Sequence, residues 1–162
     1  MPCKKCIENG GKSHSFDKIG ILNDGITHIY YTSPIRAEEV KSPDDELDLF
    51  GEHLKDTLPN KWIWIFDSKG MKARDFISGS SGKKMVELIQ EKYQDKLIGV
   101  YIVNPTSILK LFLNLINPFI KNDIKSRVHT CSLGLIDTVN KLQNAGVSTK
   151  DLHVIMKLIQ SI

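Results

Sequence analysis

The sequence predicts an α/β fold, in which a mixed, mostly parallel sheet is flanked by helices. Two largely apolar runs, 62–66 and 97–103, have the length of strands and carry no charged residue. Such runs are typical of parallel strands that are buried on both faces. Segments whose apolar residues recur at helical spacing lie between and after these runs. Strands that alternate with helices indicate right-handed crossovers within one sheet.

The composition is that of one globular domain. Of the 162 residues, 41% are hydrophobic and 25% are charged, which provides enough apolar sequence for a core. Residues 1–12 show no apolar periodicity and end in two glycines. We therefore expect a flexible leader there, followed by a single domain over residues 13–162. The net charge of +3 is too small to favour a nucleic-acid partner.

Cellular location is indicated by three features of the sequence. The chain has three cysteines, no charged-then-apolar leader, and no apolar run of ~18 residues or more. Disulfide-poor chains without export signals are typical of reducing compartments. The sequence thus predicts a cytoplasmic protein that does not span a membrane, although peripheral contact with one stays open.

A β-hairpin is expected at the start of the domain. Two strand-like runs flank residues 23–25, Asn-Asp-Gly, and the second run, 26–32, is rich in β-branched and aromatic residues. Asp-Gly between apolar runs is a strong hairpin signal. A helix is expected next, from Ser42-Pro43, where a capping residue and a first-turn proline precede two acids. Its helical spacing continues up to Pro59.

The remaining elements follow in order along the chain. A polar loop at 78–82 is expected to lead into a helix that ends near Tyr93. A short strand is expected around 127–131, and a helix over about 133–142. Residues 148–151, Ser-Thr-Lys-Asp, have the form of a capping box and predict the start of the last helix.

The segment Ser107–Ile120 is hydrophobic nearly all round. Nine of the thirteen residues from Ile108 to Ile120 are apolar, whereas an ordinary surface helix has one apolar stripe. Thirteen helical residues span about 20 Å, which is too short to cross the ~30 Å hydrocarbon layer of a bilayer. We interpret the segment as a helix that ends at Asn117-Pro118, with one side on the sheet and the other facing a ligand, a bilayer or a partner.

Motifs for catalysis or metal binding are incomplete. Cys3-x-x-Cys6 with His14 supplies fewer than the four ligands of a structural zinc site. The GSSGKK stretch at 79–84 lacks the first glycine of a phosphate-binding loop, because Ile77 stands in its place. His129 and Cys131 are two apart on a strand and are too distant for a nucleophile pair. We therefore predict a protein that is not an enzyme and has no cofactor or metal.

Several short motifs between residues 60 and 130 resemble the CRAL-TRIO domain family. Those motifs follow one another in the family's order and spacing: Asp67-x-x-Gly70, Tyr93, Leu97-x-x-x-Tyr101-Ile102-Val103-Asn104, Leu115-Ile116-Asn117-Pro118-Phe119-Ile120 and Ser126-Arg127-Val128. The resemblance implies an α/β layered fold in which a mixed sheet forms the floor of a lipid pocket that a mobile helix closes. Members bind phospholipids or other hydrophobic small molecules.

The chain also departs from the family pattern. It reaches its first strand without the N-terminal helical lobe that is usual in the family, and Gln94 stands where proline is usual after tyrosine. These departures resemble a divergent branch related to regulators of Rho-type GTPases, which acts chiefly through protein contacts.

Two functions stay open at this point. The first is non-catalytic binding of a phospholipid or other hydrophobic ligand, for transfer or sensing. The second is a protein-interaction adaptor with a filled pocket, which contacts small-GTPase regulators or associates with itself. Under the first, the expected lining is apolar: Trp62, Trp64, Phe66, Tyr101, Val103, Phe112, Leu115, Ile116, Phe119 and Val128. The expected ligands of an anionic headgroup are Lys72, Lys83, Lys84 and Arg127.

Charge is unevenly distributed along the chain. Residues 32–60 carry eight acidic and three basic side chains, whereas residues 61–90 carry six basic and three acidic ones. This pattern either forms two solvated faces or lets the basic segment meet an anionic headgroup or an acidic partner.

Overall fold

Five strands form one sheet in the computed structural model, which describes residues 15–36, 50–71 and 79–161. The strands lie in chain order across the sheet: β1 (Asp17–Ile21), β2 (His28–Thr32), β3 (Trp62–Asp67), β4 (Leu97–Val103) and β5 (Val128–Thr130). β1 pairs antiparallel with β2, and every later pairing is parallel. The prediction of a mixed, mostly parallel sheet with flanking helices is confirmed.

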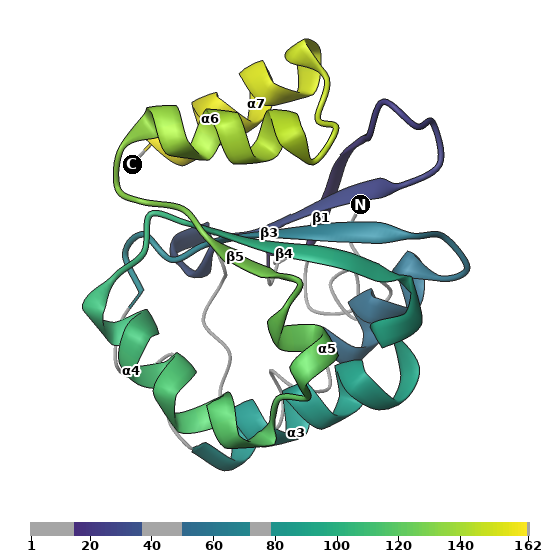
Figure 1. Ribbon diagram of the computed structural model, residues 1–162, viewed down its shortest axis with the longest axis vertical. Helices are drawn as coiled ribbons and strands as arrows, with labels where there is room; N and C mark the ends of the chain where they lie inside the picture. Colours follow the sequence, from purple (N-terminus) through teal and green to yellow (C-terminus); the bar gives the residue numbers. More distant parts are fainter. Residues whose placement is uncertain (1–14, 37–49, 72–78, 162) are drawn as a thin grey trace.

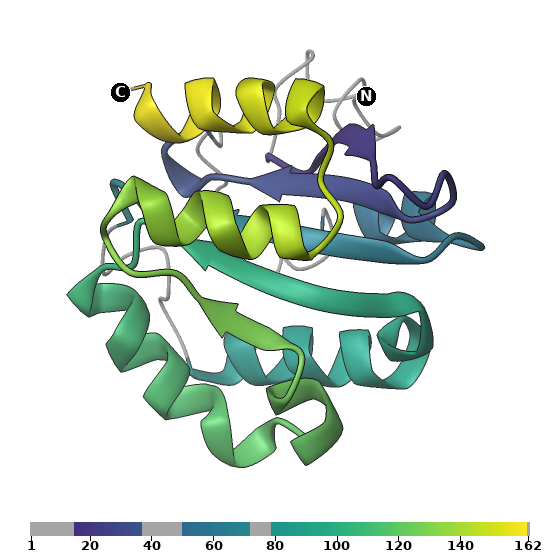
Figure 2. The same ribbon diagram turned by 45° about the horizontal axis from the view of Figure 1, so that its top comes forward.

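Helices cover both faces of the sheet, which gives three layers (Figures 1 and 2). One face carries α3 (Gly79–Lys92), α4 (Ser107–Ile116) and α5 (Asn122–Lys125), and the opposite face carries α6 (Leu135–Asn144) and α7 (Thr149–Gln160). Residues 50–54 are also helical. Short 3-10 turns complete the described segments: η1 (Pro34–Arg36), η2 (Lys55–Thr57), η4 (Gln94–Lys96) and η5 (Asn117–Phe119).

The expected hairpin joins β1 and β2. Its turn is held by Asp24, whose Oδ1 accepts hydrogen bonds from the backbone N–H groups of Ile26 (2.9 Å) and Thr27 (2.8 Å). Gly25 has φ +75°, a left-handed conformation that glycine adopts without a steric penalty. The Asn-Asp-Gly sequence therefore forms the turn because the Asp24 carboxylate accepts backbone hydrogen bonds and Gly25 adopts a positive φ.

Two helix starts are capped as their sequences indicate. The Thr106 hydroxyl accepts from the Leu109 N–H (3.2 Å) at the start of α4, and the Ser148 hydroxyl accepts from the Asp151 N–H (3.1 Å) at the start of α7. Each bond satisfies one of the free N–H groups of a first helical turn. The predicted start of the last helix is confirmed.

The prediction of a polar loop at 78–82 was wrong for residues 79–82, because α3 begins at Gly79. A first turn tolerates Gly and Ser, since its N–H groups have no intrahelical partners to lose. The leader at 1–12 and the cysteines within it lie outside the described residues, as do His14 and the expected helix start at Ser42.

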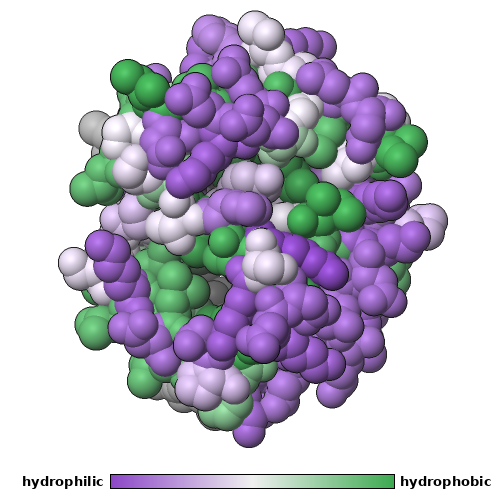
Figure 3. All heavy atoms as spheres, in the orientation of Figure 1, coloured by the Kyte–Doolittle hydropathy of each residue, from purple (hydrophilic) through white to green (hydrophobic). Residues whose placement is uncertain are grey.

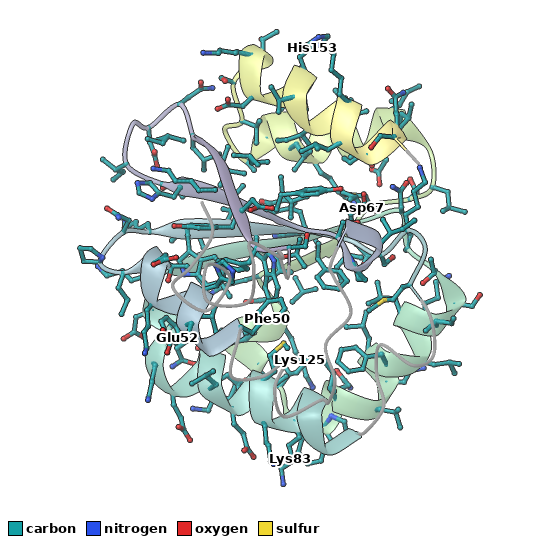
Figure 4. The ribbon with its side chains drawn as sticks, turned by 180° about the vertical axis from the view of Figure 1, so that it is seen from behind. Phe50, Glu52, Asp67, Lys83, Lys125 and His153 are labelled. Atoms are coloured by element: carbon teal, nitrogen blue, oxygen red, sulfur yellow. The ribbon has the colours of Figure 1, made fainter. Side chains whose placement is uncertain are left out.

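Alternation along the strands divides the core into two layers. Odd-numbered residues of β3, Ile63 and Ile65, face α6 and α7, where they join a buried cluster with Val103, Leu142, Ile155 and others. Even-numbered residues, Trp62 and Trp64, face the opposite layer with Phe16, Tyr30 and Phe50. Figure 4 shows Phe50 pointing into the space between the sheet and α3. The second layer contains the candidate site.

Candidate functional site

An apolar cavity of about 130 Å³ lies between the sheet and the helices α3, α4 and α5. Three strands supply its floor, namely β3 with Trp64 and Phe66, β4 with Val100 and Ile102, and β5 with Val128. The remaining wall residues are Met85, Val86, Ile89, Gln90, Leu97, Leu109, Phe112, Leu113, Ile116, Ile120 and Ile124. All of these side chains except Gln90 are apolar, so the cavity suits a hydrocarbon ligand.

A β-bulge determines which residues of β4 reach the cavity. Trp62 pairs with Leu97, but Ile63 pairs with Gly99, so Ile98 is an extra residue in β4. Alternation restarts after the bulge, and Val100 and Ile102 then share the cavity face with Leu97. Tyr101 and Val103 consequently pack on the opposite face.

Helix α4 forms one wall of the cavity and is apolar on both sides. Leu109 (3% exposed) and Ile116 (5% exposed) are buried, whereas Leu111 (65% exposed) and Leu115 (62% exposed) project into solvent. Phe112 and Leu113 complete the inner side. Hydrophobic surface also gathers around a hollow at the lower left of Figure 3, where Figure 1 places α4. One side of α4 therefore lines the cavity, and the other is presented outward.

Gln90 is the one polar residue among those that line the cavity, and both polar atoms of its amide make hydrogen bonds. Its Nε2 donates to the backbone oxygen of Phe119 (3.1 Å), and its Oε1 accepts from the backbone N–H of Lys121 (2.7 Å). Both partners lie in the segment that follows α4. The cavity therefore has an apolar interior although an amide belongs to its wall.

Comparisons with known proteins agree with this architecture. The model of the CRAL/TRIO domain matches residues 47–143, which is more than half of the chain. The chain belongs to the CRAL/TRIO domain family. Domains of this family bind lipids or other hydrophobic small molecules and are generally non-catalytic.

A solved structure supports the fold assignment of this CRAL/TRIO domain. The crystal structure of Sfh5 aligns with a TM-score of 0.51 and 17% sequence identity over 72% of this chain and 45% of Sfh5. The chain thus spans less than half the length of that neighbour, and the likeness shows the fold alone. The search of curated proteins gave no match.

Half of the lining residues expected from the sequence come together in the cavity. Those that line it are Trp64, Phe66, Phe112, Ile116 and Val128. Trp62 packs in the aromatic cluster beside it, and Tyr101 and Val103 pack under α6 and α7. Leu115 projects outward from α4. Phe119 is partly exposed, with the Lys83 ammonium 4.8 Å from its ring centre.

Several residues that line the cavity were not expected from the sequence. On α4, Leu109 and Leu113 were missed although they follow the helical spacing of Phe112 and Ile116. On β4, Val100 and Ile102 were missed because the bulge reverses the alternation. Helical spacing alone would have found the α4 residues, whereas no local signal marks Ile98 as an extra residue.

The residues expected to bind an anionic headgroup differ in their contacts and exposure. Arg127 donates to the backbone oxygens of Gln94 (2.6 Å) and Leu97 (2.9 Å), so its guanidinium attaches the first residues of η4 and β4 to the segment that precedes β5. Lys83 lies 3.8 Å from Glu87 and projects away from the sheet in Figure 4, and Lys84 is exposed. Lys72 lies outside the described residues.

Cys131 and His129, the side chains with catalytic potential on and after β5, lie in surroundings that do not activate them. Burial raises the pKa of the Cys131 thiol, which disfavours the reactive thiolate. The His129 ring stacks on Tyr101 with 4.9 Å between ring centres. In residues 15–36, 50–71 and 79–161, no three His, Cys, Asp or Glu side chains are grouped as a metal site would require. None of the helices in those ranges is long and apolar enough to cross a bilayer.

Proposed function

We propose that this CRAL/TRIO domain, formed by residues 13–162, binds a hydrophobic ligand or phospholipid without catalysis in the cavity under α4, and that α4 is a mobile lid. The observation that carries the proposal is an apolar cavity whose cover is a helix with apolar side chains on both of its sides. The outer side of an ordinary surface helix carries mostly polar side chains, whereas that of α4 exposes Leu111 and Leu115.

The size of the cavity supports a lid that moves. A cavity of ~150 Å³ accommodates one benzene molecule, and the cavity here measures about 130 Å³. An acyl chain of a phospholipid is several times longer than benzene. Entry of such a chain therefore requires α4 to move away from the sheet and enlarge the space. Each methylene buried there contributes ~0.8 kcal/mol.

The outer surface of α4 and α5 suits peripheral contact with a bilayer. Leu111 and Leu115 are exposed beside Lys110 on α4, and Lys121 and Lys125 are exposed at α5. Apolar side chains with neighbouring lysines are typical of surfaces that bind anionic lipid interfaces. We propose that the lid opens at such an interface, in the cytoplasm, and exchanges its lipid there for transfer or sensing.

Neighbouring residues of α4 provide a direct test. Ile116→Trp places a bulky ring in the cavity, whereas Leu115→Trp places the same ring on the outer side. In equilibrium titrations with a fluorescent fatty acid and no vesicles, we expect Ile116→Trp to weaken binding at least tenfold. Leu115→Trp should bind within about twofold of the wild type. Chemical denaturation of both variants checks that each is folded.

The proposal fails if the wild type binds no fatty acid and carries no lipid after purification, as measured by extraction and mass spectrometry. Equal affinities of the wild type and Ile116→Trp would place the ligand elsewhere. Equal losses in the two tryptophan variants would indicate a general effect on α4.

A protein-interaction adaptor is the second candidate, and one observation favours it. Leu133, Leu135 and Ile136 are exposed together at the start of α6, on the face opposite the cavity. Exposed apolar groups of this kind mark contact surfaces. Self-association should then appear in sedimentation experiments and decrease in Ile136→Ser. A monomer that captures no Rho-type GTPase regulator would contradict this candidate.

A further inference from the structure

The two ends of the α4 segment are attached to the rest of the domain by different kinds of hydrogen bond. Between these ends, α4 meets the domain through apolar side chains such as Leu109, Phe112 and Ile116. Apolar contacts are non-directional and allow sliding or tilting. The polar attachments at the ends therefore determine how the helix moves.

The near end of α4 is attached through Asn104. Its Nδ2 donates to the Asp67 Oδ1 (3.0 Å) and to the Ile159 oxygen (3.3 Å), and its own backbone oxygen accepts from the Ser68 hydroxyl (2.6 Å). Asp67 also accepts from the Tyr31 hydroxyl (2.7 Å) and is buried. Figure 4 shows Asp67 at the end of the sheet beside the last turn of α7. The near end is thus bonded to a carboxylate at the end of β3 and to the last turn of α7.

The far end of α4 is attached through Gln90 of α3. The Gln90 amide bonds the oxygen of Phe119, the last residue of η5, and the N–H of Lys121, which precedes α5. Both bonds join neutral groups, and Phe119 and Lys121 are exposed on their other sides. A bond between neutral groups is weaker than a bond to a carboxylate acceptor, by roughly a factor of two.

We propose that Gln90 is a positioning residue that fastens the far end of the lid, so that the lid opens there and turns about the Asn104 end. This inference rests on the proposed function and adds the direction of opening. When the far end leaves, water can replace the Gln90 amide at Phe119 and Lys121, whereas separation of the near end would remove the Asn104 amide from a buried carboxylate. Release at Gln90 is therefore the easier of the two.

Hydrogen exchange measured by NMR tests the fastening directly. The Lys121 N–H should be protected in the wild type, because Gln90 is its acceptor. Gln90→Met keeps the volume of the side chain and removes both bonds, and should speed exchange of the Lys121 N–H tenfold or more. The Lys125 N–H, which donates to the Lys121 oxygen (3.0 Å), should keep its protection.

Val86→Ala is the matched control. Val86 lines the same cavity from the same helix, but its substitution leaves the Gln90 amide in place. It should leave exchange of the Lys121 N–H unchanged. An unprotected Lys121 N–H in the wild type overturns the proposal without any variant. Unaltered protection in Gln90→Met, or an equal loss in Val86→Ala, overturns it as well.

Lipid uptake tests whether this end is the one that opens. Uptake of a fluorescent phosphatidylcholine from phosphatidylcholine vesicles, and its release to them, should both be about tenfold faster in Gln90→Met. Equal rates in the wild type and Gln90→Met overturn the opening at Gln90. If no lipid is taken up by either protein, the proposed function fails, and the exchange data alone decide whether Gln90 fastens the segment.

Discussion

Asp137 shows how one carboxylate can stabilise the start of a helix. Its Oδ2 accepts from the Ser132 N–H (2.7 Å) and from the Lys141 ammonium (3.0 Å). The hydrogen bond from the Ser132 N–H, followed by that from Lys141, lowers the pKa of Asp137 from 3.8 to about 2. The same lysine also donates to the Thr130 oxygen (2.8 Å), so this pair joins β5 to α6.

This pKa predicts an acid-dependent part of the stability. Because the pKa is lower in the folded state than in the unfolded state, the contribution of Asp137 is complete above about pH 4 and is lost as the pH falls towards 2. Asp137→Asn should be less stable than the wild type at pH 5, and the difference should shrink between pH 4 and 2. Chemical denaturation across this range measures it, and a difference that is independent of pH would contradict the assignment.

Single residues also show where prediction of the site from sequence succeeds and fails. Trp64, Phe66 and Val128 were expected in the lining and lie there, because plain alternation holds in β3 and β5. Tyr101 was expected there and lies on the other face, because Ile98 interrupts the alternation of β4. A bulge is defined by how a strand pairs with its neighbour, here β3 with β4. The sequence of β4 alone does not carry that information.

Among the elements, α4 begins with a capping bond that can be removed by one substitution. The Thr106 hydroxyl accepts from the Leu109 N–H. Thr106→Ala should therefore lower the free energy of unfolding by about 1 kcal/mol, the usual cost of losing such a cap. Thr149→Ala, at an exposed position of α7, is the control and should change it by less than about 0.5 kcal/mol. Equal values for both variants would show that the cap contributes nothing.

At the scale of elements, the sequence predicted existence better than boundaries. The hairpin, both long strands and α7 carry explicit local signals, such as Asp-Gly or a capping serine, and all are present. The start of α3 carries no such signal, because glycine and serine are common both in loops and in first turns. Beyond its first turn, α3 carries helical spacing, and α4 lies beside it.

For the molecule as a whole, the two helical layers have different tasks. The layer of α6 and α7 contributes a buried apolar cluster that includes the fully buried Ile155, whereas the layer of α3, α4 and α5 contains the cavity described above. Ile155→Ala should lower the free energy of unfolding by about 2–5 kcal/mol. Its affinity for a fluorescent fatty acid should stay within about twofold of the wild type under conditions where it is folded. A large loss of affinity would show that the layers are coupled.

The position of the cavity within the apolar layer could not be predicted from the sequence. Trp62 and Trp64 are both tryptophans on the same face of β3. Of the two, Trp64 lines the cavity and Trp62 does not. Trp62 packs instead edge-on against Phe16 and Tyr30, whose ring centres lie 5.9 and 5.8 Å from its own and which come from segments distant in the chain. Composition decides that an apolar layer forms, and three-dimensional packing decides where it leaves space.

The extra residue in β4 also affects how relatives of this chain should be compared. A homologous strand that is one residue shorter at position 98 would present the same three side chains to the cavity, since Leu97, Val100 and Ile102 alternate regularly once Ile98 is removed. An alignment that puts the gap after Ile102 would instead match that homologue's cavity residues to Gly99 and Tyr101. Pocket polarity inferred across the family therefore depends on where this single gap is placed.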